Sequence, residues 1–238
     1  MRVLVTLKPR FREKRWRAFF TGFQGIGFVG YIAIKHLVAK LRAEPVGVVE
    51  TSALPPFVWM EGGRLISPLQ LYSFNDLLFL VAEALPPIRD QYGLFRAIAD
   101  WVVDSRMEEA VLIGGLDQRF RTDGSSKARC AATEAYVRRG APILPFIEKG
   151  LLITGPLALM LHRFEVRDFP ALAILPYAAA ERPDPLAAAT SVDIINKLYG
   201  LDVDCSELIK DAERIEQEVK DLLEKRAAER RGESQAYI

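Results

Sequence analysis

The chain has 238 residues, of which 50% are hydrophobic and 26% are charged, the composition of an ordinary globular protein with room for one α/β domain and an appendage. Its formal net charge of +1 gives no general attraction for nucleic acid, so binding partners must be inferred from local features. Two cysteines exclude a disulfide scaffold, and no apolar run reaches the roughly 18 residues that a membrane-spanning helix needs. With no signal peptide at the start, we expect a cytoplasmic protein without membrane contact.

Two short strands with a basic segment between them are predicted at the start of the chain. Residues 2–7 alternate between apolar and polar side chains, and residues 18–21 form a second strand-like run. Six basic residues fall within residues 8–17. We expect this segment to form the solvated tip of a hairpin; the alternative is a patch that contacts an acidic surface of a partner.

The following residues predict a β-α-β unit and then a hairpin. A glycine-rich turn at residues 22–30 leads into an apolar-faced helix that ends near residue 41, and residues 45–50 read as a buried strand. Further along, Gly62 and Gly63 supply the positive φ angles of a tight hairpin turn.

Strands and helices continue to alternate through the next 130 residues or so. Asp184 is placed to cap a helix, Pro185 takes its first position, and Gly200 ends it. This alternation predicts a three-layer α/β/α sandwich with a largely parallel mixed sheet over residues 1–203. The remaining predicted elements are strands at 76–81, 110–115, 143–148, 151–154 and 171–175, and helices at about 86–106, 130–139 and 184–199.

A charged amphipathic helix is expected over residues 204–231, where Glu, Lys, Arg and Ala predominate. Asp204 and Glu207 have the spacing of a capping box. Apolar residues then recur at steps of four and three, which is the spacing of a short heptad seam. Such a seam can pack on its own domain or on a neighbouring subunit, so its residues are the candidates for oligomerisation. They are Leu208, Ala212, Ile215, Val219 and Leu222.

Residues 232–238 are expected to form a flexible docking tail. The segment 232–235 provides slack, and it is followed by Ala236, Tyr237 and Ile238. A free carboxylate can pair with a lysine in a partner's pocket, the tyrosine ring can bury apolar area with its hydroxyl hydrogen-bonded, and the alanine adds a small apolar contact. These three residues are the candidate partner-binding site.

An alternative function follows from the spacing Gly25-x-Gly27-x-x-Gly30, which comes after a predicted strand, opens a helix and has Glu50 at the end of the next strand. In a dinucleotide-binding enzyme such glycines approach a pyrophosphate and the acid binds a ribose hydroxyl. However, Glu50 lies 25 residues beyond Gly25, and the hairpin that follows interrupts the next β-α-β unit. The other interpretation is a tight strand-to-helix crossing with close packing.

Residues suited to catalysis are scattered along the chain. His36 lies within the first predicted helix, His162 lies near a helix end, and Cys130 has no histidine close in sequence, although the fold could bring one near. Asp117 and Asp123 could act as an acid and base pair, but carboxylates in a polar loop usually solubilise it. No metal-ligand spacing occurs and no phosphate-binding lysine follows the glycines. We therefore expect no enzyme activity, no metal and no cofactor.

Several segments occur in an order that is typical of one known family. They are residues 22–30, 37–49, Pro55 and Pro56 with Gly62 and Gly63, Gly114 and Gly115, 150–155, 183–185 and 198–202. Through these segments the chain resembles the archaeal proteasome-assembly-chaperone family over nearly its whole length. Ala236 departs from that pattern, since Leu, Ile or Val usually precedes the tyrosine.

The resemblance implies a non-catalytic, ATP-independent protein that oligomerises, with itself or with a paralogous chain. In members with such a tail it also implies docking on the α-ring of the 20S proteasome. One tail is expected to bind weakly, whereas several tails on an oligomer that faces a ring gain avidity. The sequence therefore predicts a proteasome-binding assembly chaperone or adaptor.

Overall fold

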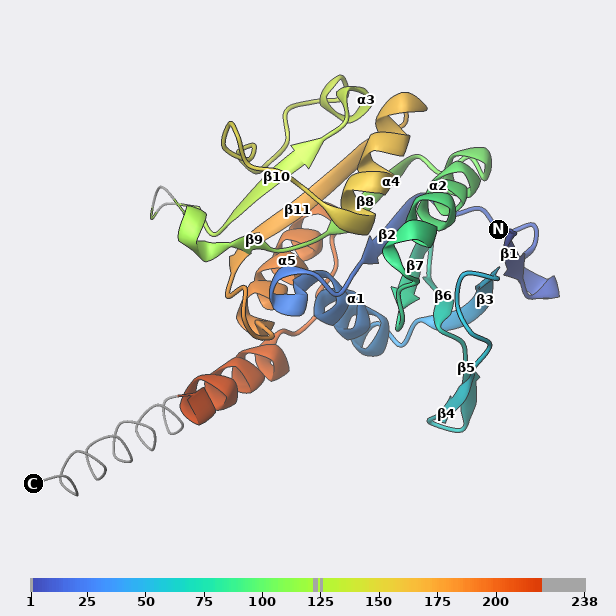
Figure 1. Ribbon diagram of the computed structural model, residues 1–238, viewed down its shortest axis with the longest axis horizontal. Coiled ribbons are helices and arrows are strands. Elements are labelled where there is room, and N and C mark those ends of the chain that lie inside the picture. Colours follow the sequence, from blue (N-terminus) through green and yellow to red (C-terminus); the bar gives the residue numbers. More distant parts are fainter. Residues whose placement is uncertain (1, 122–123, 125, 220–238) are drawn as a thin grey trace, which may run out of the picture.

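One large mixed sheet forms the centre of the molecule, for which a computed structural model describes residues 2–121, 124 and 126–219 (Figure 1). The order of eight strands across the sheet is β1 (Val3–Leu7), β3 (Glu44–Thr51), β6 (Leu69–Phe74), β7 (Leu77–Ala82), β2 (Ala18–Gly22), β8 (Glu109–Ile113), β11 (Ala171–Ala178) and β10 (Ala128–Ala132). A further short strand, β9 (Leu116–Asp117), pairs with one end of β11.

The middle of the sheet is parallel and both sides are antiparallel. Strands β7, β2, β8 and β11 run in one direction, whereas β1, β3 and β6 on one side and β10 on the other are joined by antiparallel pairing. The parallel strands are mostly apolar and buried, as expected where helices cover both faces. The predicted mixed α/β fold is confirmed.

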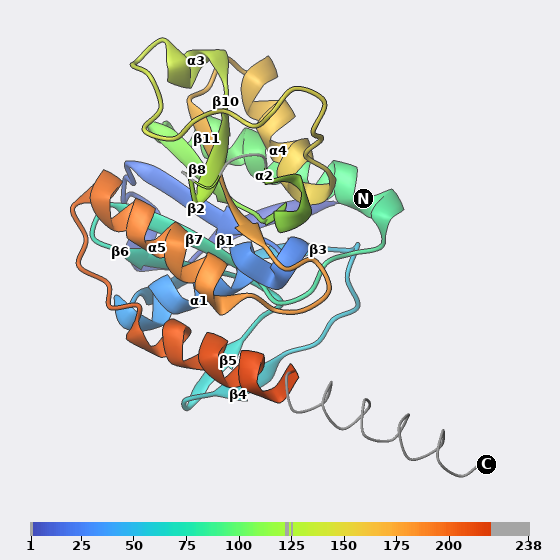
Figure 2. The same ribbon diagram turned by 90° about the vertical axis from the view of Figure 1, so that its left-hand side faces the viewer.

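Helices cover the two faces of the sheet in separate pairs. Helices α1 (Val29–Lys40) and α5 (Pro185–Tyr199) lie on one face, and α2 (Ile88–Asp104) and α4 (Gly155–Val166) lie on the other (Figures 1 and 2). Each pair encloses its own hydrophobic cluster. The short helix α3 (Glu134–Val137) follows β10, and three 3₁₀ turns lie at Pro9–Phe11, Ile26–Phe28 and Gln118–Phe120. The result is the predicted three-layer sandwich.

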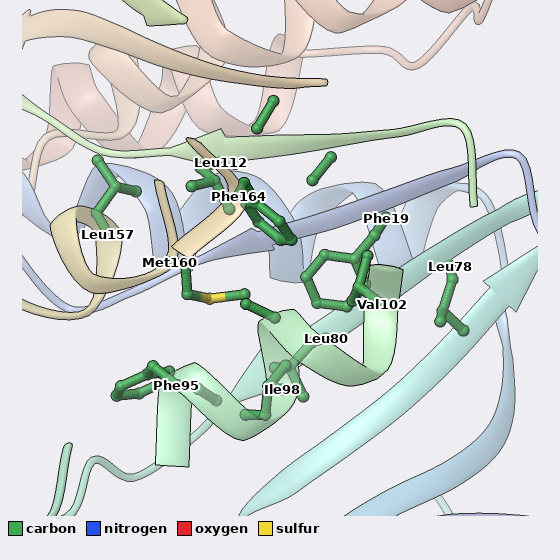
Figure 3. Packing of buried hydrophobic residues seen from close by; sticks show 14 of the residues in the cluster. Phe19, Leu78, Leu80, Phe95, Ile98, Val102, Leu112, Leu157, Met160 and Phe164 are labelled. Carbon is green, nitrogen blue, oxygen red and sulfur yellow. The ribbon is translucent and has the colours of Figure 1, made fainter. Parts of the chain in front are cut away.

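Aromatic and aliphatic side chains from α2 and α4 fill the space above the sheet (Figure 3). Phe95, Ile98, Ala99 and Val102 of α2 are buried there, whereas Tyr92 at helical spacing from them is 58% exposed. Tyr92 is the fifth residue of α2, near its N-terminal end. The residues from the two helices that pack on the sheet include Phe95, Ile98, Ala99 and Val102 of α2 and Leu157, Met160 and Phe164 of α4.

The residues 8–17 do not form a hairpin, because β1 and β2 are not neighbours. Strand β1 is the edge strand and pairs with β3, while β2 lies in the middle of the sheet. The basic segment therefore crosses between them, held by a hydrogen bond from Trp16 Nε1 to Ser73 Oγ at 2.9 Å and by the Arg17–Asp76 ion pair at 3.0 Å. The local side-chain patterns identified both strands but carry no information about their partners in the sheet.

Residues 130–154 differ most from the prediction. Cys130 lies in β10, an edge strand, and not in a helix, and the predicted strands at 143–148 and 151–154 are irregular apart from one bridge between Cys130 and Phe146. The sequence Ala128–Ala132 has no strong strand preference, so pairing with β11 decides its conformation.

The helix that begins at residue 206 is fixed to the domain at its start. Asp204 caps it by accepting a hydrogen bond from the Ser206 backbone N at 3.1 Å. The side chain of Asn196 bonds both the N and the O of Val203, at 3.1 and 2.9 Å. His36 Nε2 donates to the Asp204 carbonyl at 2.8 Å. Figure 1 shows the described part of this helix leading away from α1 and α5.

An ion-pair network joins α2 to α4. Asp100 accepts hydrogen bonds from Arg163 at 2.7 Å and from Arg167 at 2.5 Å, and Arg167 also bonds Asp104 at 2.7 Å. Burial opposes the charge on Asp100, but the bonds from the two arginines outweigh it and hold the pKa of Asp100 below its ordinary value. Its stabilising effect is therefore present above the unfolded-state pKa and is lost as the pH falls through the lower folded-state pKa.

We expect Asp100→Asn to lower the free energy of unfolding at pH 7 and to flatten its decline below about pH 5, because the lowered pKa no longer contributes. Urea denaturation at several pH values measures this, with Asp202→Asn as the control at an exposed carboxylate. If the free energy of unfolding of Asp100→Asn falls as steeply at acid pH as that of the unchanged protein, the role given to Asp100 is contradicted.

Candidate functional site

The glycine-rich turn between β2 and α1 is required by close backbone packing. A Cβ atom on Gly30 would lie 2.2 Å from the carbonyl O of Ile113, and one on Gly22 would lie 2.5 Å from the carbonyl O of Gly30. Gly27 has a φ of 60°, and its Cβ would lie 2.9 Å from that of Ala178. These glycines allow α1 to start directly against β2, β8 and β11.

The structure contradicts the dinucleotide interpretation of Gly25, Gly27, Gly30 and Glu50. In that fingerprint the acidic residue ends the strand beside the one that precedes the glycines. Here β3, which carries Glu50, is separated from β2 by β6 and β7. Glu50 accepts a hydrogen bond from Thr6 Oγ1 at 2.5 Å on the neighbouring edge strand. Because β6 and β7 lie between β3 and β2, Glu50 is too far along the sheet from the glycine-rich turn to act as the ribose-binding acid.

Gly25 differs from the other glycines of the turn, because neither its backbone nor its neighbours require glycine. Its φ is −122°, and no atom of the described residues would lie within 4 Å of an added Cβ. It lines a pocket of about 280 Å³ between the ends of β2 and β8 and the start of α4. The pocket is lined by residues 23–26, 113–116 and 152–157 and by Leu175.

The two cysteines are buried and poorly suited to act as nucleophiles. Burial raises the pKa of Cys130 to about 11, and its Sγ donates to the Leu144 carbonyl at 3.2 Å. Burial, together with the nearby Asp193 carboxylate, raises the pKa of Cys205 to about 12. His36 is tied to the Asp204 carbonyl, so it holds the fold together at that point.

Asp117 is committed to a local structural contact. Its carboxylate accepts from the Arg119 backbone N at 2.9 Å and pairs with the Arg119 guanidinium, which holds the pKa of Asp117 below its ordinary value. Its proposed partner Asp123 lies outside the described residues. No group of three or more His, Cys, Asp or Glu side chains in the described ranges is arranged to hold a metal ion. No helix in those ranges is both long and apolar enough to cross a membrane.

The heptad seam divides into two parts. Leu208 and Ala212 are buried, and Leu208 belongs to the cluster beneath α1 and α5. Ile215 is half-buried and Val219 is 36% exposed. Leu222 lies outside the described residues, as do the tail residues Ala236, Tyr237 and Ile238. The first two seam positions thus serve the domain itself, and the next two remain available for another contact.

A protruding hairpin carries exposed apolar side chains that the sequence patterns did not single out. Among the described strands, β4 (Trp59–Glu61) and β5 (Arg64–Ile66) pair with each other and not with the large sheet, and Figure 1 shows them standing out from it. Met60 and Leu65 are 64% and 63% exposed. Large apolar residues on both sides of a two-residue turn are the sequence signal that could have identified this surface.

Several solved structures have the same fold along most or all of the chain. PbaA of Pyrococcus furiosus, described as an archaeal homolog of proteasome-assembly chaperone, matches with a TM-score of 0.78 and 24% identity over 100% of this chain and 98% of its own. PbaB of the same organism, described as an archaeal proteasome activator, matches with a TM-score of 0.74 and 20% identity over 92% of this chain and 98% of its own.

Sequence comparison agrees with the structural match. The chain is 26% identical to the uncharacterized protein MJ0106 of Methanocaldococcus jannaschii over 204 residues, which cover 85% of this chain and 83% of that protein. Residues 19–223 match the PAC2 family. This span includes the glycine-rich turn, the residues that line the pocket, and the buried seam residues Leu208 and Ala212. The predicted family resemblance is confirmed, and the chain belongs to the PAC2 family.

Proposed function

We propose that this protein is an assembly chaperone or adaptor that binds the proteasome without using ATP or enzymatic chemistry. The observation that carries the proposal is the match along the full chain to PbaA, an archaeal homolog of proteasome-assembly chaperone, within the PAC2 family. The buried thiols of Cys130 and Cys205 and the structural bond of His36 also favour a binding role over catalysis.

The proposed docking group is Ala236, Tyr237 and Ile238, and the proposed partner is the α-ring of the 20S particle. The carboxylate would pair with a lysine in a pocket between two α-subunits, and the tyrosine ring would bury apolar area beside it. Because Ala236 is small, each tail would contribute a limited apolar contact. Tight binding then requires several tails at once, which makes oligomerisation part of the mechanism.

The proposed oligomer forms through the outer half of the seam. Leu208 and Ala212 are used within the chain, whereas Ile215 and Val219 lie on the described helix where it leaves the domain. Pairing of these residues between copies would remove apolar surface from water and bring the chain ends together. The cytoplasm, where proteasomes assemble, is the proposed location.

The test is binding of the purified protein to free α-rings and to complete 20S particles, without nucleotide. We expect the intact chain to bind and a chain that lacks residues 236–238 to lose binding, with Tyr237→Phe intermediate because it keeps the ring and loses the hydroxyl. Preference for free rings would favour an assembly role. Absence of binding by the intact chain would refute the proposal, and binding without the tail would refute the docking group.

A further inference from the structure

The two edges of the large sheet differ in how their backbone groups are covered. At one edge, the segment after α3 lies along β10: the Cys130 backbone N donates to the Pro145 carbonyl at 2.8 Å, and the Ile147 N donates to the Cys130 carbonyl at 2.9 Å. At the other edge, β1 pairs with β3 and with no other described strand, and Figure 1 shows it as the outermost strand on that side. An open edge strand is a template for pairing with another chain.

The backbone of β1 presents hydrogen-bonding groups that point away from β3. Lys8 N donates to the Val46 carbonyl at 2.8 Å, and the register places every second residue before Lys8 in the same kind of pair. Because bonded and non-bonded pairs alternate in an antiparallel ladder, the N–H and C=O groups of the residues between them face outward. No backbone bond from another described residue reaches these outward groups. They belong to Val3, Val5 and Leu7.

The side chains of β1 suit a neighbouring strand that is apolar at its centre. Val3, Val5 and Leu7 are half-buried against the cluster under α2 and α4. On the opposite side of the strand, Leu4 is 47% exposed and Thr6 is half-buried. A strand added at this edge would cover part of Leu4 in addition to forming hydrogen bonds.

Positive charge lies at both ends of the open edge. Arg2 precedes β1 and Lys8 follows it; both are exposed, and neither forms an ion pair with another described residue. If a second copy paired through its own β1 in the symmetric antiparallel register centred on Val5, Arg2 of one chain would lie opposite Lys8 of the other. Like charges directly opposite destabilise a strand pair. The edge therefore disfavours a second copy and favours a strand that ends in carboxylates.

The basic segment after β1 extends this positive charge. It is partly neutralised, because Arg10 is paired with Glu44 and Glu13 adds a negative charge. Its exposed basic residues that form no ion pair with a described residue include Arg12 and Arg15. Contact with an acidic partner, the alternative interpretation of this segment from the sequence, is therefore compatible with its position beside the open edge.

We propose that β1 binds an extended segment of another protein, which joins the sheet as an antiparallel strand with β-branched or apolar residues at its centre and carboxylates at its ends. Hydrogen bonds to the outward groups of β1 provide affinity, and Arg2 and Lys8 select the acidic ends. The surface is a different part of the chain from the proposed docking tail, and the inference does not depend on proteasome binding.

The fluorescently labelled peptide Glu-Thr-Val-Thr-Val-Thr-Glu is the probe, and its anisotropy in the presence of the full chain measures binding. In the antiparallel register its central threonine lies opposite Val5, and its glutamates lie opposite Arg2 and Lys8. We expect saturable binding that an N-methyl group on the central threonine weakens at least about tenfold, because that N–H faces β1. Methylation of the two valines is the matched control, since their N–H groups face away from β1, and should change binding by at most about twofold.

The charge of the peptide and residues of the protein are varied in the same assay. Replacing both glutamates of the peptide by lysine should weaken binding at least about tenfold at low ionic strength. Val5→Pro removes an outward N–H that β3 does not use, so we expect a folded protein that binds at least about tenfold more weakly. Arg2→Glu with Lys8→Glu should lose binding to a similar extent, whereas Arg139→Glu with Lys149→Glu, at two exposed residues on the β10 side of the sheet, should keep it.

Four results would overturn the proposal. Absence of saturable binding by the peptide would refute it, and equal binding of the peptide methylated at its central threonine would show attraction of charge without strand pairing. Equal binding of the glutamate and lysine peptides would remove the role given to Arg2 and Lys8. A change from oligomer to monomer in Val5→Pro, measured by sedimentation, would show that a second copy occupies the edge. The peptide series uses the unchanged protein, so it tests the proposal even where a variant fails to fold.

Discussion

Replacing Ile215 and Val219 together by glutamate is expected to weaken binding to the α-ring about 100-fold or more while leaving the domain folded. Both residues lie beyond the part of the seam that is buried against the domain, so the change places charge where copies of the chain are proposed to meet. The single tails would remain intact but would act one at a time. Surface-bound α-rings and sedimentation of the variant measure affinity and subunit number together.

The control for this variant changes the net charge equally on the solvated side of the same helix. Lys210→Gln with Arg214→Gln also shifts the charge by two units, and the ion pairs of Arg214 with described residues are exposed and lie within the helix. This control should keep its subunit number and most of its affinity. If the glutamate variant keeps its oligomeric state and its affinity, the outer half of the seam is not the contact between copies.

Gly30→Ala is expected to lower the free energy of unfolding by at least about 3 kcal/mol, a large loss for one methyl group. The new Cβ would lie 2.2 Å from the Ile113 carbonyl O and 2.8 Å from the Phe23 backbone N. These are backbone atoms of the turn after β2 and of the neighbouring strand β8, so no side-chain rotation relieves the contact. Relief requires α1 to move away from the sheet, which opens the cluster under α1 and α5.

Gly25→Ala in the same turn is the matched control, because its Cβ would meet nothing within 4 Å. We expect its stability to stay within about 0.5 kcal/mol of the unchanged protein in urea denaturation. The difference in stability between the two variants distinguishes glycines that close packing requires from glycines that a ligand requires. In a dinucleotide fingerprint, all three glycines would be needed for cofactor binding. Similar losses in both variants would contradict this account of the turn.

Local signals in the sequence predicted some elements accurately because the decisive residues are neighbours in the chain. Helix α5 begins after Asp184, which accepts a hydrogen bond from the Ala187 backbone N at 2.9 Å, and it ends at Gly200 with a φ of 64°. The hairpin turn at Gly62 and Gly63 also has the predicted positive φ angles, 55° and 77°. Caps and tight turns are determined within a few residues, so a single sequence contains the information.

Strand pairing was less accessible, because it depends on contacts between distant residues. Local patterns identified β1 and β2 as strands. They did not indicate that β1 lies at the edge of the sheet or that β2 lies four strands away from it. The pocket was missed for a similar reason, since Gly25, Gly115 and Leu152 come together only when β2, β8 and the start of α4 are adjacent. The tail and the end of the seam stay predictions, because they lie outside the described residues.

The way in which the helix from residue 206 is attached has a mechanical consequence. Hydrogen bonds from Asn196 and His36, the Lys40–Glu207 ion pair at 2.5 Å and burial of Leu208 hold its base at several points around its axis. A helix that is held at several points around its base cannot rotate freely there. A pull or a twist on the described outer end, near Val219, would be transmitted through α1 and α5 to the sheet, so the domain would respond as one body to load on this helix.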